Sequence, residues 1–167
     1  SAGSFGIEFY ASSSCNFDLR GTFNMGNFHT WGFHASTSTS ATYNENGLTV
    51  IGGDVTLQDL GRALEGMTFT GCKEITRNSA DLSGGNTISN CVDAQAITVT
   101  SEPEFAKLAN CTFKNNAVAI KITGDQSGTW SDISLTVSGN TKDIEYTGTT
   151  NFTIQSAATL TVNNSSS

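Results

Sequence analysis

Short apolar runs alternate with polar residues along this chain, and one of them recurs at a nearly constant interval. It is a tetrad that begins with isoleucine, at residues 75–78, 97–100, 120–123 and 144–147. Successive tetrads begin 22, 23 and 24 residues apart. In the later three, apolar and polar residues alternate, which is the period of a strand with one face inward and one outward. A period in the low twenties built from strand-like runs predicts a β-solenoid, in which each repeat forms one coil.

A second motif precedes the first three tetrads and ends in cysteine. Its copies end at Cys72, Cys91 and Cys111, which are 19 and 20 residues apart. Equivalent positions of a solenoid stack at the strand spacing of about 4.8 Å. We therefore expect these cysteines to form one interior column of free thiols, since free cysteine packs as a small apolar residue. The same alignment places Asn90 and Asn110 in register and predicts a ladder of side-chain amides at a bend.

The segments around the repeats are less regular. Strand-like runs at residues 48–51 and 55–57 flank a turn at residues 52–54. Apolar residues of helical spacing follow, but Gly61 and Gly66 disfavour a helix, so we interpret residues 55–67 as a strand and a loop. Ser101 and Glu104 have the spacing of a capping box, which is compatible with one helical turn.

The first 47 residues differ from the rest, and we treat them as an N-terminal region ahead of a parallel β-helix at residues 48–167. Nine of the 15 aromatic residues fall within the first 43 positions. Short alternations at residues 7–9 and 17–19 predict strands. Residues 35–47 are polar and low in complexity, and predict a loop that closes on a turn at Asn46-Gly47.

Two interpretations of this aromatic-rich region are open. It can cap the end of the solenoid, where the last strand would otherwise expose an edge and the apolar core. It can also dock onto a partner, because aromatic side chains are enriched at the buried centres of interfaces. The residues that we assign to such an interface are Phe5, Phe9, Tyr10, Phe28, Trp31 and Phe33.

Charge and composition exclude several classes of function. The chain has 167 residues, a net charge of −7 and a pI of about 4.6. Its eight basic residues are too few and too scattered to neutralise a nucleic-acid backbone. No apolar run approaches the ~20 residues needed to span a bilayer. His29 and His34 lack a nearby Asp, Glu or Cys, and the cysteine spacings do not fit zinc sites, so we expect neither a metal nor another cofactor.

The strings Ile-Ser-Asn-Cys at residues 88–91 and Asn-Cys-Thr-Phe-Lys-Asn-Asn at residues 110–116 carry a resemblance. They resemble the coils of right-handed parallel β-helix proteins of the pectate-lyase-like superfamily. More narrowly, the chain is similar to small β-helix domains of structural proteins of tailed-phage virions, which often end in a strand like residues 160–164. This resemblance covers residues 66–164 and implies an all-β, right-handed parallel β-helix with about 20–24 residues per coil.

The resemblance implies a non-enzymatic structural protein of a bacteriophage virion, most simply a capsid decoration or a short appendage. Its partners would be other capsid or tail proteins, and its place the particle surface after synthesis in the host cytoplasm. The alternative is a carbohydrate-binding or polysaccharide-cleaving domain of the tailspike type, with a host polysaccharide as partner. The sequence leaves the oligomeric state open.

Catalysis would require two positioned carboxyl groups about 5–10 Å apart. Only Glu74 and Asp93 share a place in the repeat, two residues after a cysteine, and no arginine clusters near them. We therefore expect no catalytic residues. Stacked threonine rows, with which some solenoids bind ice, are a third option. Lys121 and Glu145 replace threonine in the later tetrads, so we expect no regular threonine array.

Overall fold

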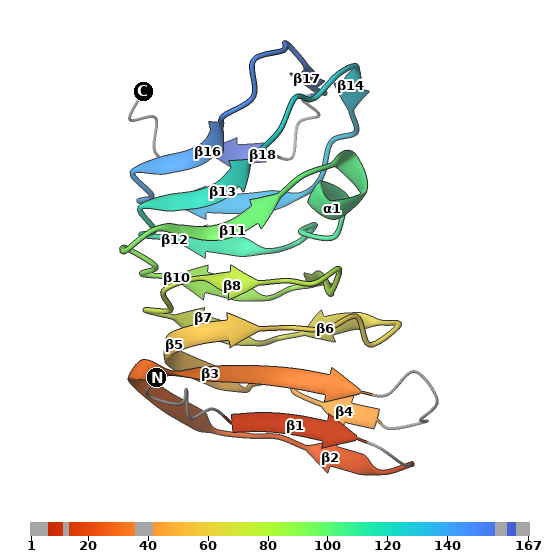
Figure 1. Ribbon diagram of the computed structural model, residues 1–167, viewed down its shortest axis with the longest axis vertical. Helices are drawn as coiled ribbons and strands as arrows, with labels where there is room; N and C mark the ends of the chain where they lie inside the picture. The colour runs from red at the N-terminus through yellow and green to blue at the C-terminus, as the bar shows by residue number, and fades with distance from the viewer. Residues whose placement is uncertain (1–6, 12–13, 36–41, 156–159, 163–167) are drawn as a thin grey trace, which may run out of the picture.

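The chain forms a parallel β-solenoid of about 5 turns, as its repeats predict. The computed structural model describes residues 7–11, 14–35, 42–155 and 160–162. Figure 1 shows the coils stacked along one axis, with the N-terminal strands at one end and the C-terminal strands at the other. All strand pairs among the described residues are parallel, so each inner coil hydrogen-bonds to the coil before it and the coil after it.

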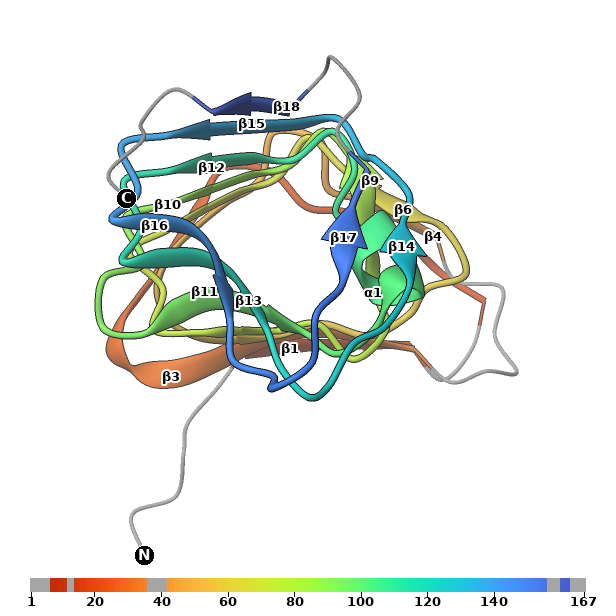
Figure 2. The ribbon, with the colours of Figure 1, turned by 90° about the horizontal axis from the view of Figure 1, so that it is seen from above.

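Seen along the axis in Figure 2, the coils enclose the core with three walls. Wall 1 contains β5 (Thr49–Thr56), β7 (Thr68–Thr70), β10 (Thr87–Ser89), β12 (Thr112–Lys114), β15 (Leu135–Ser138) and β18 (Leu160–Val162). Wall 2 contains β1 (Ile7–Ala11), β3 (Thr22–Ala35), β8 (Ile75–Thr76), β11 (Gln95–Val99), β13 (Val118–Ile122) and β16 (Lys142–Tyr146). Wall 3 contains the pairs β2 (Asn16–Asp18) with β4 (Thr42–Asn44), β6 (Ala63–Glu65) with β9 (Asp81–Gly84), and β14 (Thr129–Trp130) with β17 (Thr153–Ile154).

Two long strands, β3 and β5, bend from wall 1 into wall 2. The start of β5 pairs with β7 and its end pairs with β8. At the bend, Gly52 and Gly53 have φ of 73° and 69°, a region that favours glycine. A Cβ on Gly52 would lie 2.5 Å from the carbonyl oxygen of Gly26 in the preceding coil. The turn expected at residues 52–54 is thus a bend within one strand.

The isoleucine tetrads stack in register on wall 2, as predicted. Ile75 lies opposite Ile97, Ile97 opposite Ile120, and Ile120 opposite Ile144. The first three are buried and Ile144, on the terminal coil, is half-buried. Full burial of one such side chain stabilises the fold by about 1.5–3 kcal/mol, so this column is a main part of the core.

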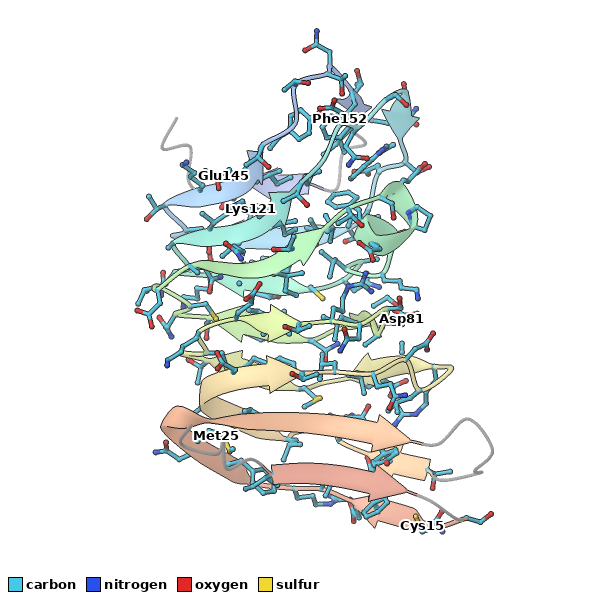
Figure 3. All side chains as sticks on the ribbon, in the orientation of Figure 1. Cys15, Met25, Asp81, Lys121, Glu145 and Phe152 are labelled. Carbon is cyan, nitrogen blue, oxygen red and sulfur yellow. The ribbon has the colours of Figure 1, made fainter. Side chains whose placement is uncertain are left out.

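The polar residues of the tetrads lie on the outer face of wall 2. Thr98 is in register with Lys121, and Lys121 with Glu145. Lys121 Nζ lies 3.9 Å from a carboxylate oxygen of Glu145, and Figure 3 shows the two residues on neighbouring coils. The predicted alternation of inward and outward positions is confirmed.

The expected column of three cysteines is wrong in its third member. Cys72 and Cys91 each follow a strand of wall 1, whereas Cys111 precedes β12. The coil from β10 to β12 is longer because it contains α1 (Glu102–Ala106), so the residue that follows Cys91 in its column is Asn116, 25 residues on. All four cysteines, including the half-buried Cys15, are free.

The amide ladder exists, but at other residues than expected. Asn90 and Asn110 are exposed and lie at opposite ends of their strands. The ladder is formed by the buried Asn116 and Asn140, whose side chains are 2.9 Å apart from Nδ2 to Oδ1. Asn90 instead shares a left-handed turn position with Asn115, with φ of 57° and 56°. These two asparagines therefore serve the backbone bend, since asparagine tolerates that region.

The single helix of the described residues, α1, confirms the expected helical turn between Ser101 and Glu104. The capping differs from the predicted box, because the Ser101 side chain makes no capping hydrogen bond. Glu104 instead accepts hydrogen bonds from the Thr100 backbone N–H and Oγ1, at 2.8 and 2.9 Å. No helix among these residues is long and apolar enough to cross a membrane.

The N-terminal strands belong to the solenoid sheet. β1 pairs with β3, and β3 pairs with β5. Sheet pairing therefore crosses residue 47, where we expected one region to end and the next to begin. β2 and β4 continue wall 3, and Phe17 stacks on Tyr43 with ring centroids 4.9 Å apart. A separate aromatic cap stays a prediction, and residues 36–41 of the expected polar loop lie outside the described residues.

Threonine occupies one register position on seven consecutive strands, from the start of β3 through wall 1. These residues are Thr22, Thr49, Thr68, Thr87, Thr112, Thr136 and Thr161. The row two residues further along is mixed, with Thr70 and Ser89 followed by Lys114. The expectation of no regular threonine array thus holds for wall 2 and is wrong for wall 1.

Candidate functional site

A depression of about 360 Å³ opens beside α1, at the end of β8 and β11 on wall 2. Its lining is polar apart from one isoleucine. The lining residues are Glu74, Ile75, Thr76, Arg77, Asn78, Ser79, Thr98, Thr100 and Glu104. They come from two neighbouring coils and from the helix inserted in the second of these coils.

Arg77 is the least expected residue of this lining. The register of Ile75 with Ile97 gives Arg77 the place that the buried Val99 holds in the next coil. The guanidinium is accordingly buried, with only 5% of the residue exposed. Burial lowers the pKa of Arg77 from its ordinary value, while the nearby Glu104 carboxylate acts in the opposite direction.

The guanidinium is only partly satisfied by its surroundings. One terminal nitrogen donates to the carbonyl oxygen of Ala80, and the other lies 3.7 Å from Glu104. Nε has no hydrogen-bond partner among the described residues. An unpaired buried donor typically costs about 1–3 kcal/mol, and such groups are often explained by a ligand, an ion or water. Arg77 therefore marks this place as a candidate site.

Glu104 links the helix to the depression. Its carboxylate receives two hydrogen bonds from Thr100 and faces the charge of Arg77. Burial acts to raise the pKa of Glu104, but these hydrogen bonds and the positive charges of Arg77 and Lys107 outweigh it, so the pKa lies below its ordinary value. A carboxyl group held in the ionised form accepts hydrogen bonds and is a poor general acid at neutral pH.

The rim beside Arg77 has an unusual backbone. Asn78 and Ser79 follow one another with φ of 45° and 65°, and both are exposed. Two successive left-handed residues other than glycine are strained, and such strain gathers at functional sites. The carbonyl oxygen of Ser79 accepts a 2.6 Å hydrogen bond from Lys107 Nζ, which helps to fix this turn.

The opposite rim is formed by Glu74, which accepts a 3.1 Å hydrogen bond from Gln95. Asp93, which we aligned with Glu74, is exposed in the turn ahead of β11 and does not line the depression. Between the two rims lie the hydroxyl groups of Thr76, Thr98 and Thr100. Hydroxyl, amide and carboxylate groups together can exchange several hydrogen bonds with a polyhydroxylated ligand.

Sequence reasoning missed this site, although one signal for it was present. In the later tetrads the third residue is Val99, Ile122 or Tyr146, whereas the first tetrad has Arg77. A cation at a position that must face the core is an anomaly that points to a site. The contribution of Glu104 depends on how α1 folds back, which the repeat does not encode. No cluster of three or more metal-ligating side chains occurs in the part of the chain that the structure describes.

The residues expected at a partner interface fall on the two N-terminal strands of wall 2 or beyond the described residues. Phe5 lies outside the described residues. Phe9 and Tyr10 are in β1, opposite Phe33 and His34 of β3. Trp31 is in β3 opposite the buried Val55, and Phe28, also in β3, lies between two shifts of register. Their role in an interface stays a prediction.

Comparison of the chain with family models, with curated proteins and with solved structures finds no match in any of the three. Its function is therefore inferred from its own residues.

Proposed function

We propose that this chain is a non-enzymatic structural component of a bacteriophage virion, as a capsid decoration or a short appendage, with other virion proteins as its partners. The observation that carries the proposal is the parallel ladder, which joins one strand to the next from β1 to the last coil. With a filled core, such a ladder makes each coil a rigid support for its neighbours. Rigidity without mobile parts suits a building element of a particle.

The resemblance of the coil motifs to virion β-helix domains supports the placement in a phage. The attachment would use the N-terminal region, where aromatic residues are concentrated. This surface includes the open edge of β1, since β1 pairs only with β3 among the described strands. An unpaired strand edge presents backbone donors and acceptors to another chain.

The test is to purify particles of the phage that encodes the chain and to identify their proteins by mass spectrometry. We expect the chain in the particle band at a fixed ratio to the major capsid or tail protein. Removal of residues 1–33 is a poor test, because it would strip β3 from β5. Serine at Phe5, Tyr10 and Phe28 should instead lower incorporation, whereas Lys114→Ser on wall 1 should not. Absence of the chain from purified particles would overturn the proposal.

A second candidate function is favoured by the depression around Arg77. Its hydroxyl groups, carboxylates and Asn78 fit the binding of a host-surface glycan, with the particle as carrier. Titration calorimetry with the host polysaccharide should detect binding that Thr98→Val weakens at least tenfold. Thr136→Val, the same change on wall 1, should leave the affinity unchanged. Release of new reducing ends or unsaturated sugars in the same mixture would assign a cleaving enzyme instead.

A further inference from the structure

Cys72 and Cys91 take equivalent places in two neighbouring coils of wall 1. β7 and β10 pair with Thr70 opposite Ser89, and each cysteine lies two residues after these partners. Cys72 Sγ lies 3.9 Å from the carbonyl oxygen of Thr70, and Cys91 Sγ lies 3.7 Å from that of Ser89. The two side chains therefore have matching orientations, and one thiol stands directly over the other.

The backbone around the two cysteines matches as well. Gly71 and Asn90, which precede them, have φ of 63° and 57°. Neighbouring strands lie about 4.7–4.9 Å apart. Disulfide bonds join residues with Cα atoms about 4.4–6.8 Å apart. The pair thus falls within the range that a disulfide requires, and no rearrangement of the coils is needed.

The two thiols also interact chemically. The Cys72 thiol hydrogen-bonds to the sulfur of Cys91, and this contact raises the pKa of Cys72 and lowers that of Cys91. Ionisation of the pair therefore begins at Cys91. The thiolate is the species that reacts in disulfide formation, and its reaction partner is already in contact with it.

We propose that Cys72 and Cys91 are a cross-linking site, at which oxidation joins two successive coils through a disulfide bond. Two S–H bonds break and one S–S bond forms, while two protons and two electrons pass to the oxidant. With diamide, its N=N bond takes up both and becomes a hydrazine. With a small disulfide such as oxidised glutathione, two glutathione thiols are released.

Cys111 has no part in this site. It lies ahead of β12 in a different column, and its Sγ is 3.2 Å from the carbonyl oxygen of Leu82. Burial raises the pKa of Cys111 to about 12, so it is almost wholly protonated at neutral pH. The place above Cys91 is occupied instead by Asn116, whose Oδ1 accepts a hydrogen bond from the Cys91 backbone N–H at 3.0 Å.

Access to the pair requires a local opening of one turn. Cys72 and Cys91 are 1% and 0% exposed. The residues around them at this corner are exposed, and Val92, directly after Cys91, is 66% exposed. Turns of this kind open locally at a smaller free-energy cost than global unfolding. We therefore expect slow but selective oxidation, confined to this pair.

The cross-link would fasten the loop between residues 72 and 91 and stabilise the two coils. Loops of this length gain roughly 3 kcal/mol in the chain-entropy model. For a chain of this size that corresponds to a rise of about 5–10 °C in the midpoint of thermal unfolding. If the proposed function holds, the bond would form once a particle leaves the reducing cytoplasm of the host.

The experiment treats the folded, full-length protein with diamide and then maps its peptides by mass spectrometry without reduction. We expect a linked pair of peptides that contain Cys72 and Cys91, a loss of two hydrogen masses and two titratable thiols fewer. The oxidised protein should unfold at the higher temperature given above, and reduction should reverse the shift. This readout needs no variant, so a failure of a mutant to fold cannot obscure it.

Three variants complete the test. Cys111→Ser should form the link as the parent chain does, whereas Cys72→Ser and Cys91→Ser should not form it. The proposal is overturned if the folded protein keeps all its thiols over many hours while the urea-unfolded protein oxidises. It is also overturned if the main link includes Cys111. Neither result bears on whether the chain occurs in phage particles.

Discussion

Asn116 and Asn140 lie one above the other in successive coils, and the Nδ2 of Asn116 donates a 2.9 Å hydrogen bond to the Oδ1 of Asn140. The same Oδ1 also accepts from the Asn116 backbone N–H at 2.8 Å. One coil below, Asn116 receives the Cys91 N–H on its own Oδ1 and donates to the carbonyl oxygen of Ile88 at 3.1 Å. Each amide thus satisfies backbone groups that the bend between wall 1 and wall 2 removes from the sheet.

This role predicts a large effect of truncating Asn116. Asn116→Ala leaves a buried N–H of Cys91 and a carbonyl of Ile88 without partners, each at a cost of about 1–3 kcal/mol. We expect the free energy of unfolding in urea to fall by roughly 2–4 kcal/mol. The neighbouring Asn115→Gly is the control, because Asn115 is exposed with φ of 56°, which glycine adopts freely. Equal losses in the two variants would contradict the ladder.

The wall 2 register predicts opposite outcomes for two adjacent residues. Ile120 is fully buried between Ile97 and Ile144, so Ile120→Asp places an unpaired charge in the core. We expect a loss of at least about 4 kcal/mol in unfolding free energy, or failure to fold. Lys121 lies on the outer face, where threonine holds the same place in the preceding coil. Lys121→Thr should therefore change the stability by less than about 1 kcal/mol, its ion pair with Glu145 being exposed to solvent.

Arg77 allows a test that separates burial of charge from loss of volume. Its column neighbours are the buried Leu57 and Val99, so Arg77→Leu replaces an incompletely paired cation with a side chain that suits the column. Such replacements are often neutral or stabilising by about 1–4 kcal/mol. Arg77→Ala should lower the stability by roughly 2 kcal/mol, because it leaves a cavity. If chemical denaturation ranks Leu below Ala, Arg77 is a structural cation and the case for a ligand site is weakened.

The repeat carries the architecture, because each coil must place apolar residues at the same points of its wall. The steps between Ile75, Ile97, Ile120 and Ile144 therefore predict the stacking and the inward face of wall 2. The alignment through the cysteines misassigns Cys111, because α1 lengthens one coil and shifts every later residue of wall 1. A local insertion of this kind is invisible when two motifs share the pair Asn-Cys. The threonine row of wall 1 is missed for the same reason.

The candidate site lies beyond the reach of periodicity. It depends on the irregular features of the coil, namely a cation at an inward position, two left-handed residues and a helix that returns Glu104 to Arg77. Of these, only Arg77 is visible as a departure from the tetrad pattern. Strain at Asn78 and Ser79 becomes apparent only from the backbone angles, because asparagine and serine are common in ordinary turns.

The environment of Glu104 predicts how the stability changes with acid. Its pKa in the folded protein lies below the ordinary value, which in an unfolded chain is about 4.3. The carboxylate therefore stabilises the fold fully above that value, and this contribution is lost as the pH falls through the folded-state pKa. Glu104→Gln should lower the urea midpoint at pH 7, yet lose less than the parent chain between pH 5 and about 3. Thr100→Val removes one of the two donors to Glu104 and should fall between them. Parallel pH profiles for all three proteins would show that the Thr100–Glu104–Arg77 contacts do not stabilise the ionised form.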